Sequence, residues 1–435
     1  MLFVNGAPDV LLAHTNLTKK QKEKVLSEIN DLTKQGKRLM GLARKKVSLT
    51  KKRISAEDHK KGLEWVGVLV FSDPVRQSVK AALDEAKNAG IKIVVITGDY
   101  ALTAQHVMNE VGLSVSSREI MTGEQLRKLD AQNLSEKIKG IRLFARTTPD
   151  QKQLIVDALQ KNGEVVAMMG DGVNDAQAIH KSDIGIVVES ASDVARESAD
   201  LVLLDSNFST IVAAIEEGRA IFDNIRKIIL YLLSDAFVEI LIVIGGIFLS
   251  LPLPITAVQI IWVNLVSDGF PGLALTIDPK RRGIMSEPPR SPKERLVANW
   301  MLYLVSTVCV FAGGAALAVF YFTYKATGNV ELARSLTFVT LGLNSMAYVF
   351  SVRSLLTPFW RTNLFENKYL IISVVAGIIL QIVPFLTEGT RAFFRVTTLE
   401  VGHWALAAAL SVSVFVVVEI FKEVKLIHPS KSSEG

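Results

Sequence analysis

Long apolar runs in the C-terminal half of the chain constrain its fold more than any other feature. After about residue 225 the sequence holds runs of spanning length at residues 228–250, 255–277, 299–323, 334–356, 369–387 and 402–422. A membrane-spanning helix needs roughly 20 mostly apolar residues, so each run is long enough to cross a bilayer. We therefore expect an all-α membrane domain of six transmembrane helices.

The preceding part of the chain alternates strand and helix patterns. Strand-like runs at 64–71, 91–97, 142–146, 164–170, 183–188 and 200–205 are separated by helical patterns such as 75–90, 101–112 and 148–163. This alternation is typical of a parallel, doubly wound sheet. It predicts one α/β Rossmann-like domain, with residues 64–71 as its first strand.

These patterns predict five consecutive parts. Residues 1–60, with a polar helix over 18–35 and a strand over 38–43, are too few to bury a core alone and form a partial domain. Residues 61–208 form the Rossmann-like domain, 209–227 a stalk helix that continues into the first span, 228–424 the membrane domain, and 425–435 a tail. The loops after the second and fourth spans are rich in Lys and Arg, which favours the cytoplasmic side for them and for the soluble domain.

Charge and cysteine content exclude several functions. The net charge of +6 comes largely from basic residues beside apolar runs and from a mixed-charge stretch over 19–61, so we expect no nucleic-acid partner. The single cysteine, Cys309, excludes an intramolecular disulfide, and no signal peptide is evident. We expect an integral multi-pass protein of the plasma membrane, with the lipid bilayer as a partner.

Four turns at the ends of predicted strands carry polar residues, and together they indicate a phosphate site. Because carboxyl ends of parallel strands share one edge of a sheet, turns that are far apart in sequence can meet there. The turns are Asp73-Pro74-Val75-Arg76, Thr97-Gly98-Asp99, Thr147 to Lys152, and Gly170-Asp171-Gly172-Val173-Asn174-Asp175.

Phosphoryl transfer needs mainly positioning and neutralisation of charge on the phosphoryl oxygens. Lys152, the Thr97 hydroxyl and backbone N–H groups can supply this together with a Mg²⁺ ion held by Asp171. The alternative for the last turn is a structural Asx-turn and helix N-cap.

Ionisable residues within two of the predicted spans indicate a second site. Asp235 and Glu239 are four residues apart in the first span, as are Asn264 and Asp268 in the second, so each pair shares a helix face. Glycine and proline at 269–272 favour a broken helix whose free carbonyl groups also coordinate a cation.

Other polar residues in the spans have plainer interpretations. The alternative for Asp235 is a solvated helix cap or an ion-pair partner of Lys227. We expect Asn344 to form an interhelical hydrogen bond and Glu419 to be solvated.

Several motifs together resemble one family, the P-type ATPases, which are ion pumps with a haloacid dehalogenase-type phosphorylation domain. They are residues 73–76, TGD at 97–99, ARTTPDQK at 145–152, GDGVNDAQAIHKSDIGI at 170–186 and WVNLVSDGFPGLALTIDP at 262–279. The last is similar to a membrane helix of the calcium-pump-like branch.

The resemblance implies roles for individual residues of the soluble domain. Asp171 would bind Mg²⁺, Lys152 would contact the transferred phosphate, Thr97 and Gly98 would hydrogen-bond it, and Asp99, Asn174 and Asp175 would complete the catalytic site.

The resemblance also implies a nucleotide site for ATP. VNGAPDVLL at 4–12 is similar to a motif of the family's nucleotide-binding domain, so residues 1–60 would be part of that domain and Gly6 would lie at the nucleotide. Asn5 replaces the usual lysine of this motif. Arg38, Asp73 and Arg76 would be further nucleotide-binding residues.

For the transported cation, the resemblance implies Glu239, Asn264 and Asp268 as ligands, whereas Ala236 stands where the branch often has asparagine. Hard oxygen ligands favour Ca²⁺, and Mn²⁺, Na⁺, K⁺ and H⁺ stay open.

The family's phosphorylated Asp-Lys-Thr-Gly-Thr motif does not occur in this sequence. We therefore expect the C-terminal part of a pump that is inactive alone, with a separately encoded N-terminal half as one arrangement. The alternatives are a noncatalytic membrane subunit and a membrane-anchored phosphatase.

Overall fold

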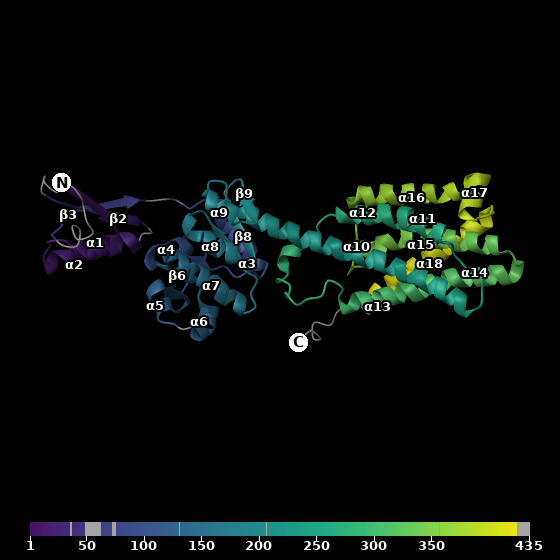
Figure 1. Ribbon diagram of the computed structural model, residues 1–435, viewed down its shortest axis with the longest axis horizontal. Helices are drawn as coiled ribbons and strands as arrows, with labels where there is room; N and C mark the ends of the chain where they lie inside the picture. The colour runs from purple at the N-terminus through teal and green to yellow at the C-terminus, as the bar shows by residue number, and fades with distance from the viewer. Residues whose placement is uncertain are drawn as a thin grey trace. The chain divides into compact units, whose positions relative to one another are not determined.

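The computed structural model describes residues 1–34, 37–47, 62–71, 75–129, 131–205, 207–355 and 357–423. The chain divides into two compact units, Met1–Ile215 with Met285–Pro292, and Glu216–Ile284 with Lys293–Gly435. Figure 1 shows the chain with most of its helices and strands labelled.

An antiparallel sheet opens the first unit. Its strands β1 (Leu2–Gly6), β2 (Arg38–Lys45) and β3 (Glu64–Phe71) pair in that order, and the helices α1 (Pro8–Ala13) and α2 (Lys19–Lys34) lie between β1 and β2 in the chain. The prediction that 64–71 is the first parallel strand was therefore wrong. An apolar strand of this kind can pair in either a parallel or an antiparallel sheet. The strand that it pairs with, β2, lies upstream in sequence.

The remaining strands of this unit are parallel, as predicted, but they form two hydrogen-bonded sheets rather than one. One sheet has the order β4 (Val95–Ile96), β6 (Leu143–Ala145), β5 (Ile120–Thr122). The other has the order β7 (Ala167–Gly170), β8 (Ile184–Val188), β9 (Leu201–Leu203). The strand β5 was not predicted. Thr122, its last residue, caps the helix α5 (Gly123–Arg127).

Short helices connect these strands. They are α3 (Ser78–Asn88), α4 (Ala101–Glu110), α6 (Ala131–Lys137), α7 (Pro149–Lys161), α8 (Ala176–Lys181) and α9 (Asp193–Glu197). The helix α7 contacts the cores of both parallel sheets, because its neighbouring residues Ile155 and Val156 are fully buried in different apolar clusters. Thr148 and Gln151 form a capping box and Pro149 occupies the first turn, which fixes where α7 begins.

The second unit is a helical bundle. In the described part of the chain, six helical stretches are long and apolar enough to cross a membrane. They are α10 (Phe208–Phe248), α11 (Ala257–Trp262) with η4 (Val263–Gly269) and α12 (Phe270–Thr276), α13 (Asn299–Val308) with η6 (Cys309–Gly313) and α14 (Gly314–Thr327), α15 (Val330–Arg353), α16 (Lys368–Leu386), and α18 (Val401–Glu423). A short helix, α17 (Glu388–Phe394), follows α16. All six predicted spans are thus helical.

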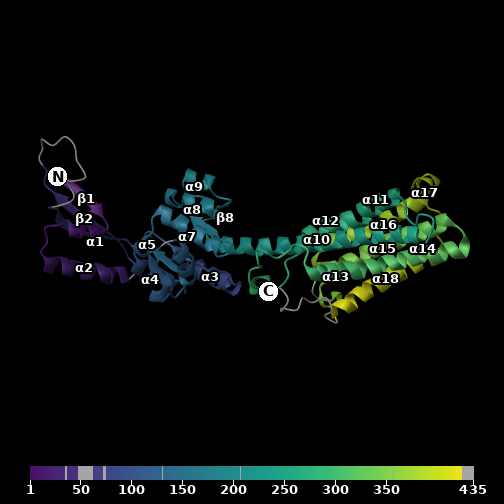
Figure 2. The same ribbon diagram turned by 60° about the horizontal axis from the view of Figure 1, so that its bottom comes forward.

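The helix α15 is the most enclosed of these spans. Of the most apolar 18-residue stretch of α15, 83% is buried, whereas the corresponding share in the other five spans is 28–50%. Figures 1 and 2 both show α15 side by side with α18. Polar groups carried by α15 are therefore shielded from lipid, and the functional residues of this unit should be sought around it.

Two expectations about the spans were wrong. The second span is not broken after Asp268, because the segment η4 is a π-helix that continues directly into α12. Glu419 is not solvated: it is fully buried and pairs with Lys422 at 2.8 Å. The stalk, by contrast, is helical and continuous with the first span, since α10 runs through both.

Candidate functional sites

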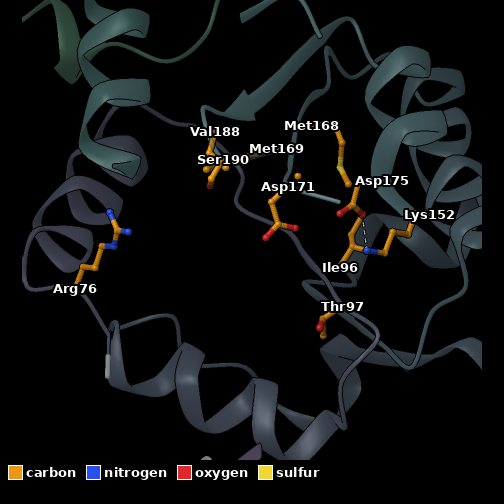
Figure 3. Close-up of a pocket in the computed structure, with 11 residues that line it drawn as sticks. Arg76, Ile96, Thr97, Lys152, Met168, Met169, Asp171, Asp175, Val188 and Ser190 are labelled. Carbon is orange, nitrogen blue, oxygen red and sulfur yellow. Dashed lines mark hydrogen bonds and ion pairs between the residues drawn. The ribbon is translucent and has the colours of Figure 1, made fainter. Parts of the chain in front are cut away.

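A polar hollow of about 550 Å³ lies at the carboxyl ends of strands in both parallel sheets. Figure 3 shows the Asp171 side chain pointing into it, with Arg76 on one side and Lys152 beside Asp175 on the other. The predicted convergence of distant turns is therefore present. The full lining is Arg76, Ile96, Thr97, Lys152, Met168, Met169, Gly170, Asp171, Asp175, Val188 and Ser190.

Lys152 and Asp175 form a nearly buried ion pair in this hollow. The Lys152 Nζ atom lies 2.5 Å from Asp175 Oδ1, and their side chains are 13% and 11% exposed. Lys152 comes from the first turn of α7, and its orientation follows from Ile155, three residues later, which packs into the core. Asp175 thus holds the ammonium group at the edge of the hollow, where a phosphoryl group would meet it.

The turn after β4 places the Thr97 hydroxyl group in the lining of the hollow, on the same side as Lys152 (Figure 3). The Thr97 backbone N–H donates to Phe144 of the neighbouring strand, and its carbonyl accepts from Thr147. The Thr97 hydroxyl accepts from the backbone N–H of Asp99 at 3.1 Å. Gly98 and Asp99 follow Thr97 in this turn but do not line the hollow.

The turn after β7 presents Asp171. A Cβ atom on Gly170 would lie 2.5 Å from Asp175 Cβ, so glycine is what lets the strand end approach Asp175 this closely. Within the described residues the Asp171 carboxylate has no side-chain hydrogen bond, and only its backbone carbonyl accepts, from Ser192. A free carboxylate beside an open polar space suits a hard cation such as Mg²⁺.

Not every predicted residue reaches this hollow. Gly6 ends β1 in the antiparallel sheet, and Asn174 lies in the turn η3 (Val173–Asp175) without lining the hollow. The Arg38 backbone is in β2, but its side chain lies outside the described residues, as does all of Asp73.

Sequence reasoning missed Ser190, which lines the hollow after β8. The rule that used the ends of four strands would have found it if applied to the run at 183–188 as well.

A contact between Asp9 and the turn region lies near this site. The Tyr100 hydroxyl donates to Asp9 Oδ1, and Arg146 Nη2 lies 3.2 Å from Asp9 Oδ2. The Arg146 guanidinium also stacks 4.0 Å over the Tyr100 ring. Burial, followed by the hydrogen bond to Asp9, raises the pKa of Tyr100 to about 12.

In the helical bundle, polar side chains of α10 and η4 meet at two levels. At the first level the Asn264 amide donates to the Glu239 carboxylate at 3.3 Å; Glu239 is half-buried and Asn264 exposed. One helical turn away lie Asp235 and Asp268, 3% and 1% exposed. The predicted pairing of the two helix faces is therefore observed.

Asp235 is neither a solvated cap nor a partner of Lys227, so both plainer interpretations were wrong. Lys227 pairs instead with Asp278 at 2.6 Å. Ser345 on α15 bridges the two aspartates, with its Oγ 2.8 Å from Asp235 Oδ2 and 2.6 Å from Asp268 Oδ1. Ser345 could not be singled out from the sequence, because serine residues are common in buried membrane helices.

Several polar atoms around this pair are buried without a partner. Among the described residues these include Ser267 Oγ, Asp268 Oδ2 and both amide atoms of Asn344, so the expected interhelical hydrogen bond of Asn344 is absent. No group of three or more His, Cys, Asp or Glu side chains in the described chain is placed to hold a metal. A cation bound here would therefore take further ligands from hydroxyl, amide or backbone oxygens.

Two family models match the chain. Residues 6–183 match the haloacid dehalogenase-like hydrolases, and residues 252–424 match the C-terminus of cation transporting ATPases. The first unit therefore has a haloacid dehalogenase-type Rossmann-like fold. The chain is a multi-pass membrane protein with an all-helical membrane domain.

Curated relatives agree with these models. The chain is 36% identical over 422 residues to a calcium-transporting ATPase of Bacillus subtilis, covering 94% of this chain and 47% of that protein. It is 34% identical over 425 residues to calcium-transporting ATPase 1 of Bacillus cereus, covering 94% and 48%. It is 30% identical over 466 residues to calcium-transporting ATPase 3, endoplasmic reticulum-type, of Arabidopsis thaliana, covering 97% and 47%.

The chain belongs to the P-type cation-transporting ATPases and corresponds to their C-terminal part. It spans about half the length of the curated relatives it matches.

Proposed function

We propose that this chain supplies the phosphorylation chemistry and the ion pathway of an ATP-driven cation pump, with Ca²⁺ as the transported ion. The observation that carries this proposal is the hollow in which Thr97, Lys152 and Asp171 meet at strand ends. The names of the relatives support Ca²⁺ as the ion. They do not favour the phosphatase or the noncatalytic subunit.

Each residue of the hollow has a distinct role in this proposal. Asp171 would hold a Mg²⁺ ion, and that ion would supply positive charge to the phosphoryl oxygens of ATP. Lys152 contacts the same oxygens as a point charge, and Asp175 keeps its ammonium group in place. The Thr97 hydroxyl and the N–H of Gly98 would hydrogen-bond the phosphoryl group, while Asp99 and Asn174 would order their turns.

The nucleotide would be held partly by Arg76, which lines the hollow, and partly by Gly6, Arg38 and Asp73. Since the sequence contains no Asp-Lys-Thr-Gly-Thr motif, we propose that this chain forms no phosphoenzyme alone. A separately encoded N-terminal half is one arrangement that would complete the pump.

In the membrane unit, Glu239, Asn264 and Asp268 would bind the transported cation. Their oxygens are hard ligands that suit Ca²⁺, with Mn²⁺, Na⁺, K⁺ and H⁺ as alternatives to be tested. We propose the plasma membrane as the location of the pump. We propose the cytoplasm as the side of its first unit, because the loops after the second and fourth spans are rich in Lys and Arg.

The test is ATP hydrolysis by the complete pump, in which this chain is joined to or co-expressed with the N-terminal part found in its relatives. Purified pump is titrated separately with Ca²⁺, Mn²⁺, Na⁺ and K⁺ in the presence of Mg²⁺. We expect stimulation by Ca²⁺ that Asp268→Asn abolishes. Hydrolysis that no cation stimulates, or that keeps its cation dependence in Asp268→Asn, would contradict the proposal.

A further inference from the structure

We propose that Arg334 and Arg395 form a binding site for the phosphate group of an anionic phospholipid. The site lies at the distal end of the helical bundle, by which we mean the end where α10 and α16 finish and α15 begins. It goes beyond the proposed function, because neither arginine lines the hollow or belongs to the proposed cation ligands.

Arg334 joins the start of α15 to the connection between α10 and α11. Its guanidinium group donates to the Leu253 carbonyl oxygen from Nε at 3.2 Å and from Nη2 at 3.0 Å. A guanidinium group has more N–H donors than these two contacts use, so hydrogens remain for another acceptor. Glu331, on the same helix, is exposed and forms no ion pair with Arg334 in the described chain. The positive charge of Arg334 therefore has no carboxylate partner there.

Arg395 lies at the same junction. The carbonyl group of the residue before it accepts a hydrogen bond of 2.9 Å from the Gln259 side chain of α11. Two residues after it, the backbone N–H of Thr397 donates to Ser335 Oγ at 2.8 Å, and Ser335 is the neighbour of Arg334 on α15. The segment that carries Arg395 is thus held between the starts of α11 and α15, where Arg334 also lies.

The backbone of Arg395 adopts a conformation that favours glycine. Its φ angle is 53°, in the left-handed region, at the residue that ends α17. Its side chain is exposed and has no hydrogen-bond or ion-pair partner among the described residues. An arginine at a position suited to glycine, with a guanidinium group that no described residue engages, indicates a ligand from outside the chain.

An anion would resolve the charge at this junction. Near the other end of the bundle a buried arginine is neutralised, as Arg353 is by Asp278 at 2.9 Å. Arg334 and Arg395 have no such partner in the part of the chain that the structure describes, and their like charges repel each other. Phosphate oxygens match the planar fork of a guanidinium group, so one phosphate group can accept from both arginines.

Apolar side chains beside the arginines favour a phospholipid over a small anion. Leu386 at the end of α16 and Phe393 in α17 are 63% and 66% exposed. Figures 1 and 2 both show α17 next to the end of α16, and the most apolar stretch of α16 is only 28% buried. Lipid headgroups lie where the spans end, so acyl chains would continue along α16. An anionic lipid fits better than a zwitterionic one, which brings a positive charge of its own.

The experiment is native mass spectrometry of the purified chain in detergent, titrated with dioleoyl phosphatidylglycerol or dioleoyl phosphatidylcholine. We expect Arg395→Gln and Arg334→Gln each to weaken phosphatidylglycerol binding about tenfold, because charge-assisted hydrogen bonds to phosphate are lost, and to leave phosphatidylcholine binding nearly unchanged. Lys325→Gln removes an exposed charge near the end of α14, at the same end of the bundle. It is the matched control and should bind both lipids as the wild type does.

Arg395→Gly separates lipid binding from folding. Glycine adopts the left-handed conformation without strain, so this variant should melt no lower than the wild type while it binds phosphatidylglycerol more weakly. If Arg395→Gly melts lower, Arg395→Gln decides in the same way, since its side chain replaces one that has no partner among the described residues. Wild-type phosphatidylglycerol binding in the deciding variant overturns the inference.

Two further outcomes test what the site recognises. A molar excess of inorganic phosphate should displace little phosphatidylglycerol, because phosphate has no acyl chains to lie beside Leu386 and Phe393. Displacement by an equal concentration of phosphate would overturn the assignment to a lipid. Equal weakening in Lys325→Gln and Arg395→Gln would show that binding follows the net charge of the distal end, and would likewise overturn the inference.

Discussion

Asp278→Asn is predicted to destabilise the helical bundle strongly. Asp278 follows α12, and its side chain is 4% exposed. One carboxylate oxygen accepts from Lys227 Nζ at 2.6 Å, and the other accepts from Arg353 Nε and Asn367 Nδ2, each at 2.9 Å. A single carboxylate thus joins α10, α15 and the start of α16.

The magnitude follows from what the substitution leaves behind. Asparagine keeps one acceptor oxygen, but its amide group turns two donor hydrogens toward buried cations. Removing one partner of a buried ion pair costs about 3–5 kcal/mol, because the remaining charge is not solvated. At roughly 2–4 °C per kcal/mol for a unit of this size, the melting temperature should fall by about 6–20 °C.

Thermal unfolding of the purified chain in detergent, followed by circular dichroism, measures this change. Glu366→Gln is the control: Glu366 pairs with the same Arg353 at 3.5 Å, but its side chain is 45% exposed. An exposed pair contributes less than about 1 kcal/mol, so this variant should melt close to the wild type. If Asp278→Asn also melted like the wild type, the reasoning that this network holds the helices together would be refuted.

Three further substitutions test local features. Gly170→Ala places a Cβ atom 2.5 Å from Asp175 Cβ and should displace Asp175 from Lys152, costing about 1–3 kcal/mol in chemical unfolding and most of the pump's ATP hydrolysis; wild-type values for both would contradict the described turn. Gly342→Ala places a Cβ atom 2.8 Å from the buried Gln381 amide and should cost about 1–3 kcal/mol through strain between α15 and α16; thermal unfolding measures this, and an unchanged melting temperature would show that Gln381 moves freely. Asp9→Asn should lower the pKa of Tyr100 from about 12 toward its ordinary value. Because the pKa is raised in the folded chain, Tyr100 contributes stability that is fully present below the unfolded pKa of about 10 and is lost as the pH rises through the folded value. Tyrosinate absorbance against pH measures the pKa, and a wild-type titration in Asp9→Asn would rule out the contact.

The hollow could be predicted because a general rule places the turns. Carboxyl ends of parallel strands share an edge, so Thr97, Lys152 and Asp171 could be brought together without coordinates. The same rule could not assign strand 64–71, because an apolar strand does not reveal whether its partner is parallel or antiparallel. That information lay in β2, which pairs with it antiparallel.

The membrane residues show a different limit. Lys227 and Asp235 are two turns apart on α10, which made an ion pair conceivable, but Lys227 is neutralised by Asp278 from 51 residues away. A long-range partner of this kind leaves no local signal in sequence. Glu419, by contrast, lies three residues before Lys422, and that spacing alone could have indicated a helical ion pair.

The central claim is that the hollow and the membrane carboxylates belong to one coupled pump. Its most direct test is labelling of the complete pump with radioactive ATP and Mg²⁺, with and without Ca²⁺, followed by acid quenching. We predict acid-stable label that requires Ca²⁺, is lost in Asp171→Asn and is lost in Asp268→Asn. Label that forms equally without Ca²⁺, or that survives both substitutions, would contradict this account.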